Sequence, residues 1–142
     1  MKMRIIDGVR IPDGWEIVDG PHELYHTAAC NWEERKIYKG KKDVKYPQIA
    51  LAHEAAHARW IDKGLVASEF SDRVKHEIIA GIYELHFALK RRNVEEIKST
   101  QNLIESNAFH RHAEEHTKAA RRIMQGRLWE RCKQFVKQES GC

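Results

Sequence analysis

A change of pattern at Pro47 constrains the fold of this 142-residue chain more than any other sequence feature. Before it, short apolar runs alternate with turn residues, as in Arg4–Ile11, where Asp7 and Gly8 form a preferred two-residue hairpin turn. After it, apolar residues recur every three or four positions, which is the period of a helix. The sequence therefore predicts an α+β fold, in which a small antiparallel sheet packs on the first of several helices.

Further strands are expected before Pro47. Residues 15–18 are predicted as one strand, and residues 25–30 and 35–39 as a second hairpin across the turn 31–34. Residues 1–46 are thus assigned mainly to strands, within one domain that spans residues 1–142.

Helices are expected from Pro47 onward. The first runs from Pro47 to Lys63 and stops at Gly64, because a glycine is well suited to the residue after a helix. The second begins after Ser71, and residues 47–92 hold these two helices. Its apolar side chains form a stripe that is expected to be buried: Val74, Ile78, Ile82, Leu85 and Leu89.

The C-terminal part, residues 93–142, is also predicted to be helical. One helix begins at Asn93, with Glu96 placed as in a capping box and with Ile97, Leu103 and Ile104 on its apolar side. A last long helix is expected from Asn107 to Gln138.

Composition excludes several classes of protein. No run approaches the roughly 20 apolar residues of a membrane span, and the N-terminus lacks the apolar region of a secretory signal. The cysteines, Cys30, Cys132 and Cys142, are odd in number and widely spaced, which favours a reducing compartment. We therefore expect a cytoplasmic protein with no membrane partner and an undetermined oligomeric state.

The formal net charge of +4 is mild and lies largely in the C-terminal third. It is typical of a solvated helix face, and no interleaving of basic and aromatic residues favours a nucleic-acid partner.

The segment 53–57, HEAAH, contains the residue types of a catalytic metal site. His53 and His57 are four residues apart, so they lie on one helix face, about 6 Å apart along the axis, and can reach one Zn²⁺ ion. Glu54, beside the first histidine, can point toward a metal-bound water and is the general base in this motif. Small apolar neighbours favour a buried helix here.

A second pattern, HxxEH, occurs at His112–His116. Its flanks are charged, which indicates an exposed helix. Surface solvation is therefore the favoured interpretation of this second pattern. A regulatory metal contact from His110, His112 and His116 remains an alternative.

A catalytic zinc needs a third protein ligand and an open position. Glu77 is the best candidate, because it follows His57 by 20 residues and a short connection allows the two helices to pack together. Glu84 lies two helical turns after Glu77 on the same side, and it is either a ligand or a hydrogen-bond partner of a ligand histidine. His76 is the remaining alternative.

The segments 50–57 and 77–80 resemble the gluzincin metallopeptidases, in particular short forms such as the minigluzincins and the ImmA-like peptidases. This resemblance covers roughly residues 30–90. It implies a zincin-like fold in which His53, His57 and Glu77 bind zinc and Glu54 activates water, and hence a zinc metallopeptidase acting on a peptide or protein. The chain also resembles the SprT-like proteases, which have a histidine at a similar distance after HExxH, and His76 is the residue that matches this histidine.

The chain departs from the gluzincin pattern at Gly81, where many members have Asp or Asn, and at Arg59, where many zincins have an apolar residue. The alternative hypothesis is therefore a catalytically silent zincin-like scaffold that binds protein or nucleic acid. In zincins the strand before the metal helix, here 35–38, is usually a sheet edge to which an extended peptide can pair. Candidate donors to the oxyanion are Tyr83, His86, His26 and Arg59.

Overall fold

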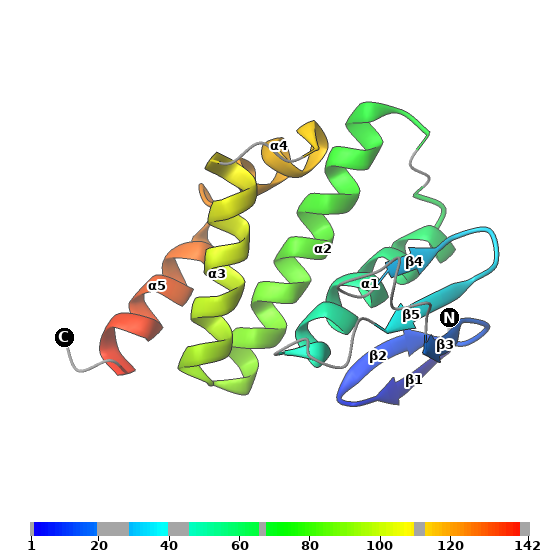
Figure 1. Cartoon of the computed structure of the whole chain (residues 1–142), viewed down its shortest axis with the longest axis horizontal. Helices are drawn as coiled ribbons and strands as arrows, with labels where there is room; N and C mark the ends of the chain where they lie inside the picture. The colour runs from blue at the N-terminus through cyan, green and yellow to red at the C-terminus, as the bar shows by residue number, and fades with distance from the viewer. Residues whose placement is uncertain (1, 20–28, 40–45, 66–67, 110–112, 140–142) are drawn as a thin grey trace. The chain divides into compact units, whose positions relative to one another are not determined.

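The computed structural model describes residues 2–19, 29–39, 46–65, 68–109 and 113–139. The chain forms two compact units, Met1–Leu65 and Val66–Cys142. In the described residues, the first unit contains all the strands and one helix, and the second contains the remaining helices (Figure 1). The predicted α+β class is confirmed.

The N-terminal hairpin has the predicted two-residue turn. Strands β1 (Met3–Ile6) and β2 (Val9–Pro12) are antiparallel, and Ile6 is paired with Val9. Asp7 and Gly8 between them have φ angles of 52° and 81°. Two consecutive positive φ angles define a type I′ turn, whose twist matches that of the strands it joins.

A second, three-stranded sheet has the order β3-β5-β4, from β3 (Glu16–Asp19), β4 (Ala29–Asn31) and β5 (Lys36–Lys39). The predicted hairpin is confirmed for its described residues, because β4 and β5 are antiparallel. In contrast, β3 runs parallel to β5, so the sheet is mixed rather than purely antiparallel. Residues 20–35 separate these two strands, which is enough for the crossover that parallel strands need.

The position of β5 corrects one expectation. Because β5 pairs with β3 on one side and with β4 on the other, it is the central strand and not a sheet edge. The expectation that a peptide pairs with residues 35–38 is therefore wrong. Among the described strands of this sheet, β3 and β4 are the outer ones.

Helix α1 (Pro47–Asp62) has the predicted bounds to within one residue. Pro47 occupies its first turn, and Gly64, with φ of 94°, follows its C-terminal end. The amide of Gly64 donates to the Ile61 carbonyl at 2.9 Å, and the amide of Leu65 donates to the Trp60 carbonyl at 3.0 Å. These two bonds make a Schellman motif, which satisfies the last carbonyls of the helix.

Small residues on α1 bring the helix close to the strands. Ala55, Ala56 and Ala58 are fully buried, and α1 contacts β2, β4 and β5. Among the buried apolar side chains of this unit, three large ones are at most 1% exposed: Ile11, Trp15 and Ile37. Each contributes roughly 1.5–3 kcal/mol by its removal from water.

The second unit consists of α2 (Phe70–Arg91), α3 (Val94–Phe109), α4 (Glu114–Ile123) and α5 (Arg127–Glu139), and α2 contacts the other three. The long helix expected from residue 107 to 138 is wrong. Between α4 and α5, the amides of Gln125 and Gly126 donate to the carbonyls of Arg122 and Ile123. These tight turns, together with the low helix propensity of glycine, end α4.

The start of α3 is capped by Asn93, as expected. Its Oδ1 accepts hydrogen bonds from the amides of Glu95 and Glu96, at 3.0 and 3.2 Å. The Glu96 carboxylate, predicted to complete a capping box, instead accepts two hydrogen bonds from the Arg91 guanidinium, at 2.7 and 3.0 Å. A charged bidentate partner is the stronger one for a buried carboxylate.

The buried face of α2 differs from the predicted apolar stripe. Of the stripe residues, only Leu85 is fully buried, and Ile82 is 41% exposed. The side chains that are buried are His76, Ala80, Gly81, Glu84, Leu85 and Ala88. Half of these residues are small and permit close helix contacts, and His76 and Glu84 are polar, so the buried face of α2 is not the apolar stripe.

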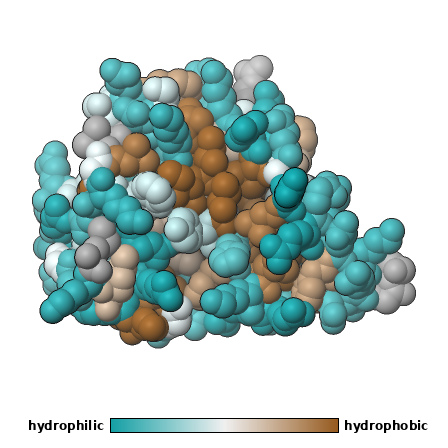
Figure 2. Space-filling view, turned by 180° about the vertical axis from the view of Figure 1, so that it is seen from behind, coloured by the Kyte–Doolittle hydropathy of each residue, from teal (hydrophilic) through white to brown (hydrophobic). Residues whose placement is uncertain are grey.

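Figure 2 shows one face of the molecule on which hydrophilic residues predominate, with apolar residues gathered between them. Two exposed apolar side chains belong to α3: Leu103, predicted to face the core, is 51% exposed, and Phe109 is 69% exposed. In the described part of the chain, no helix has both the length and the apolarity that a membrane crossing needs.

Candidate metal centre

His53 and His57 lie together on α1, as their spacing predicts. Their ring centroids are 5.0 Å apart, and the ring planes meet at 66°. His57 is only 5% exposed, whereas His53 is half-buried. Two imidazoles one turn apart on one helix face are suited to share a metal ion.

Trp32 packs against His57. It lies in the turn between β4 and β5, and its ring centroid is 6.1 Å from that of the imidazole, with the planes at 37°. A large aromatic side chain at this distance restricts the rotation of His57 and shields it from water. No role for Trp32 could be predicted from the sequence, because an aromatic residue in a turn belongs to no chemical motif.

Glu54 lies near Cys30 of β4. Burial raises the pKa of the Cys30 thiol, and the negative charge of Glu54 raises this pKa further, while a hydrogen bond with Trp32 acts in the opposite direction. A nearby carboxylate disfavours a second negative charge, so this thiol remains protonated at neutral pH. The position of Cys30 beside the motif could not be predicted from the sequence, because its spacing matches no metal-binding pattern.

The C-terminal end of α1 is fixed to the strands by polar contacts. Asp62 accepts a hydrogen bond from Trp15 Nε1 at 3.1 Å and forms an ion pair with Arg35. Arg59 donates to the carbonyl oxygen of Arg10 at 2.9 Å. Arg59, a candidate oxyanion donor in the sequence, therefore also has a structural contact, which holds α1 to β2.

The candidates for the third ligand lie on α2, in the second unit. Glu77 is partly accessible, with 17% of its side chain exposed, and its Oε2 lies 3.5 Å from Nε2 of His116. His76 and Glu84 are more deeply buried, at 2% and 4% exposed. Glu77 is thus the most accessible of the three.

The HxxEH segment contributes contacts to α2. His116 contacts Glu77, and Glu115 lies 4.0 Å from Arg73. His110 and His112, like His26, lie outside the described residues. Of the other oxyanion candidates, Tyr83 is 37% exposed, and His86 is also exposed.

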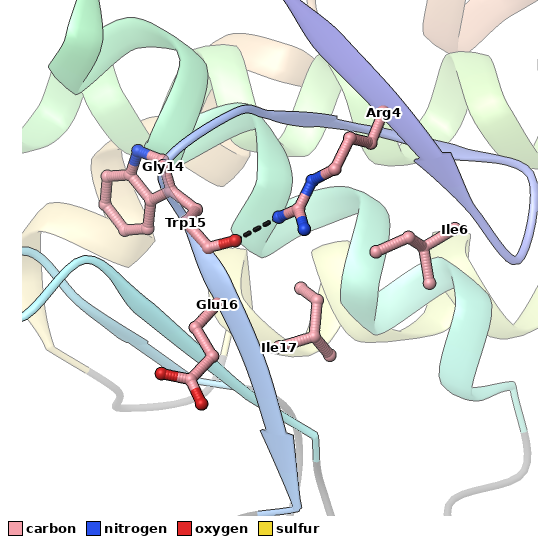
Figure 3. A pocket seen from close by; sticks show the side chains of 6 residues that line it. All are labelled: Arg4, Ile6, Gly14, Trp15, Glu16 and Ile17. Carbon is pink, nitrogen blue, oxygen red and sulfur yellow. Dashed lines mark hydrogen bonds between the residues drawn. The ribbon is translucent and has the colours of Figure 1, made fainter.

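A pocket of about 380 Å³ in the first unit is lined by residues of β1, β3 and the segment before β3 (Figure 3). The guanidinium of Arg4 points to the carbonyl oxygen of Trp15, to which it donates a hydrogen bond, and it lies 3.6 Å from Asp13. None of the residues proposed for the metal site lines this pocket. Its one cationic group already has acceptors in the protein, so the pocket offers no strong anion site.

The first unit thus brings His53, Glu54 and His57 together on one helix, and Glu77 belongs to the second unit. Comparisons of the chain with models of protein families, with curated proteins and with solved structures give no match.

Proposed function

We propose that this protein is a zinc-dependent peptidase, in which His53, His57 and Glu77 hold the metal and Glu54 is the general base. The observation that carries the proposal is the pair of imidazoles on α1, 5.0 Å apart, with a glutamate beside the first of them. This is the arrangement that a helical HExxH motif requires.

The donor set has the chemistry of a catalytic zinc site. Two imidazole nitrogens and one carboxylate oxygen are ligands that zinc accepts, and three protein ligands leave one position for water or substrate. The contact of Trp32 with His57 supports the site, because a ligand with a fixed ring loses less conformational entropy when it binds. Glu77 supplies the third ligand from α2.

The reaction follows from these residues. When bound, zinc supplies a Lewis acid that polarises the scissile carbonyl and makes water acidic. Glu54 accepts the proton of the attacking water and passes it to the leaving nitrogen. Glu54 is half-buried, which strengthens its interaction with a nearby proton donor relative to bulk water.

The substrate is a peptide or a protein in an extended conformation. Among the described strands, β4 is an outer strand of its sheet; it contacts α1, and its Cys30 lies near Glu54. A peptide that pairs with an outer strand gains main-chain hydrogen bonds, and pairing with β4 would place it beside the general base. The structure therefore supports β4, and not β5, as the substrate-binding strand.

The experiment measures metal content and peptide cleavage in the same preparations. Purified protein is expected to hold about one zinc per chain and to cleave a quenched-fluorescence peptide library. Glu54→Gln is expected to keep the zinc and to lose cleavage by a factor of about 10²–10⁴. Glu33→Gln, an exposed glutamate in the β4–β5 turn, is the matched control and keeps both.

Normal cleavage by Glu54→Gln would refute the role of Glu54. A protein free of zinc after expression with zinc supplied would refute the metal site. It would favour the second candidate function, a protein-binding scaffold, for which the exposed Leu103 and Phe109 of α3 are the supporting observation.

A further inference from the structure

Helix α4 contacts the N-terminal half of α2 through several side chains. His116 Nε2 lies 3.5 Å from Glu77 Oε2, and Glu115 lies 4.0 Å from Arg73. Lys118, also on α4, places its ammonium 5.2 Å from the centre of the Phe70 ring. The three residues lie within about one turn of α4, and their partners are spread over two turns of α2, so they hold this turn of α4 in one alignment against the N-terminal half of α2.

The apolar side of α4 fixes this alignment. Ala119, Ala120 and Ile123 are buried, and the Ile123 side chain occupies the space beside Gly81, one turn after Glu77. Arg121 also donates a hydrogen bond from Nε to the carbonyl of Ala108 at 3.1 Å, which ties α4 to α3. His116 therefore reaches Glu77 from a rigid element.

We propose that His116 is a positioning residue, which donates from Nε2–H to Oε2 of Glu77 and thereby orients this carboxylate as a metal ligand. The inference rests on the proposed function, because it assumes that Glu77 binds the metal. A carboxylate can accept a hydrogen bond on one oxygen and coordinate a cation through the other. Such a hydrogen bond fixes the carboxylate plane and typically contributes 10–100-fold to metal affinity.

The proposal also gives the HxxEH segment a function that is not metal coordination. In that pattern the final histidine, His116, would itself bind the metal. Its contact with Glu77 instead lets it orient a residue that binds the metal. Glu115, its neighbour, contacts Arg73 instead.

The test measures the zinc dissociation constant by competition with a chromogenic chelator. His116→Ala is expected to weaken zinc binding about 10–100-fold. His116→Gln is expected to restore most of the affinity, because its side-chain amide supplies a donor near the position of Nε2. Glu115→Ala is the matched control: it removes a contact between the same two helices without touching Glu77, and zinc affinity is expected to be unchanged.

A second background separates positioning from direct coordination. In Glu77→Ala, His116→Ala is expected to cause no further loss of zinc affinity, because the residue that His116 orients is absent. A further loss in that background would overturn the proposal and make His116 a ligand itself. Equal losses in His116→Ala and Glu115→Ala would also overturn it, because both would then reflect helix docking alone.

The failure of the proposed function has a different result. If the wild type binds zinc but His116→Ala binds it equally well, only the positioning role of His116 is refuted. If the wild type binds no zinc, the metal site itself is refuted, and this role with it.

Discussion

Ile123 of α4 occupies the space into which a side chain on Gly81 of α2 would extend. A Cβ atom built on Gly81 would lie 2.4 Å from Ile123 Cδ1, far inside van der Waals contact. Both residues are buried. A glycine inside a helix costs about 1 kcal/mol relative to alanine, and here that cost is offset by the close approach of α4.

Gly81→Ala is therefore expected to destabilise the protein by about 1 kcal/mol, although it raises helix propensity. The added methyl overpacks a buried contact, which typically costs about 1–3 kcal/mol. Ile123→Val in the same background removes Cδ1 and is expected to recover part of this loss. Urea unfolding of the three proteins measures the effect.

Gly126→Ala is the matched control, because its nearest contact, with the Ile123 carbonyl, is 3.4 Å. Gly126 directly precedes α5, where alanine is a poorer N-cap than glycine, so this substitution is expected to cost about 0.5–1 kcal/mol, and Ile123→Val is expected to recover none of it. If Gly81→Ala were more stable than the wild type, Ile123 would not be the reason for the glycine.

Asp62 is expected to contribute more to the stability of the first unit than the exposed Asp13 does. Asp62→Ala is expected to lower the free energy of unfolding by about 2–3 kcal/mol, because it leaves the indole N–H of Trp15, which is 1% exposed, without its acceptor. Asp13→Ala removes an exposed ion pair with Arg4 and is expected to cost less than about 1 kcal/mol. Equal losses at the two positions, measured by chemical denaturation, would contradict this assignment.

Local chemistry explains which parts of the fold could be predicted from the sequence. Asp7 and Gly8 tolerate positive φ angles, so the first turn could be placed to the residue. Pro47 and Gly64 determine where α1 begins and ends, because each suits one helix end and disfavours the other. Within α1, the pairing of His53 and His57 follows from helix geometry alone.

The features that were predicted wrongly all depend on contacts between segments that are distant in the sequence. The sequence does not encode locally that β3 pairs with β5, or that small residues of α2 are buried while Ile82 is exposed. The neighbours of α1 also depend on such distant contacts. Cys30 and Trp32 precede α1 by more than a dozen residues, and only the folding of the second hairpin brings them to it.

Trp32 offers a spectroscopic measure of the proposed metal site. Because its ring lies 6.1 Å from that of His57, Co²⁺ bound at His57 is expected to quench its fluorescence. Trp32→Phe is expected to reduce the Co²⁺-dependent quenching without abolishing it, because Trp60 lies three residues after His57 on α1, whereas Trp129→Phe, on α5 of the second unit, leaves it unchanged. Quenching of unchanged amplitude in Trp32→Phe would place the metal away from this turn.

The thiol of Cys132 gives a prediction for alkaline pH. Burial raises its pKa to about 11 from an ordinary value near 9, and the charge of Arg131 opposes this only in part. The unfolded chain therefore loses this proton at lower pH than the folded protein. The resulting stabilisation is fully present below pH 9 and is lost as the pH rises to about 11, and it amounts to about 1–2 kcal/mol.

Urea unfolding of the wild type and of Cys132→Ala at several pH values measures this contribution of Cys132, because the variant lacks the titrating thiol. The difference in stability between the two proteins is expected to shrink between pH 9 and 11, and a difference that stays constant would show that the thiol does not titrate differently in the two states.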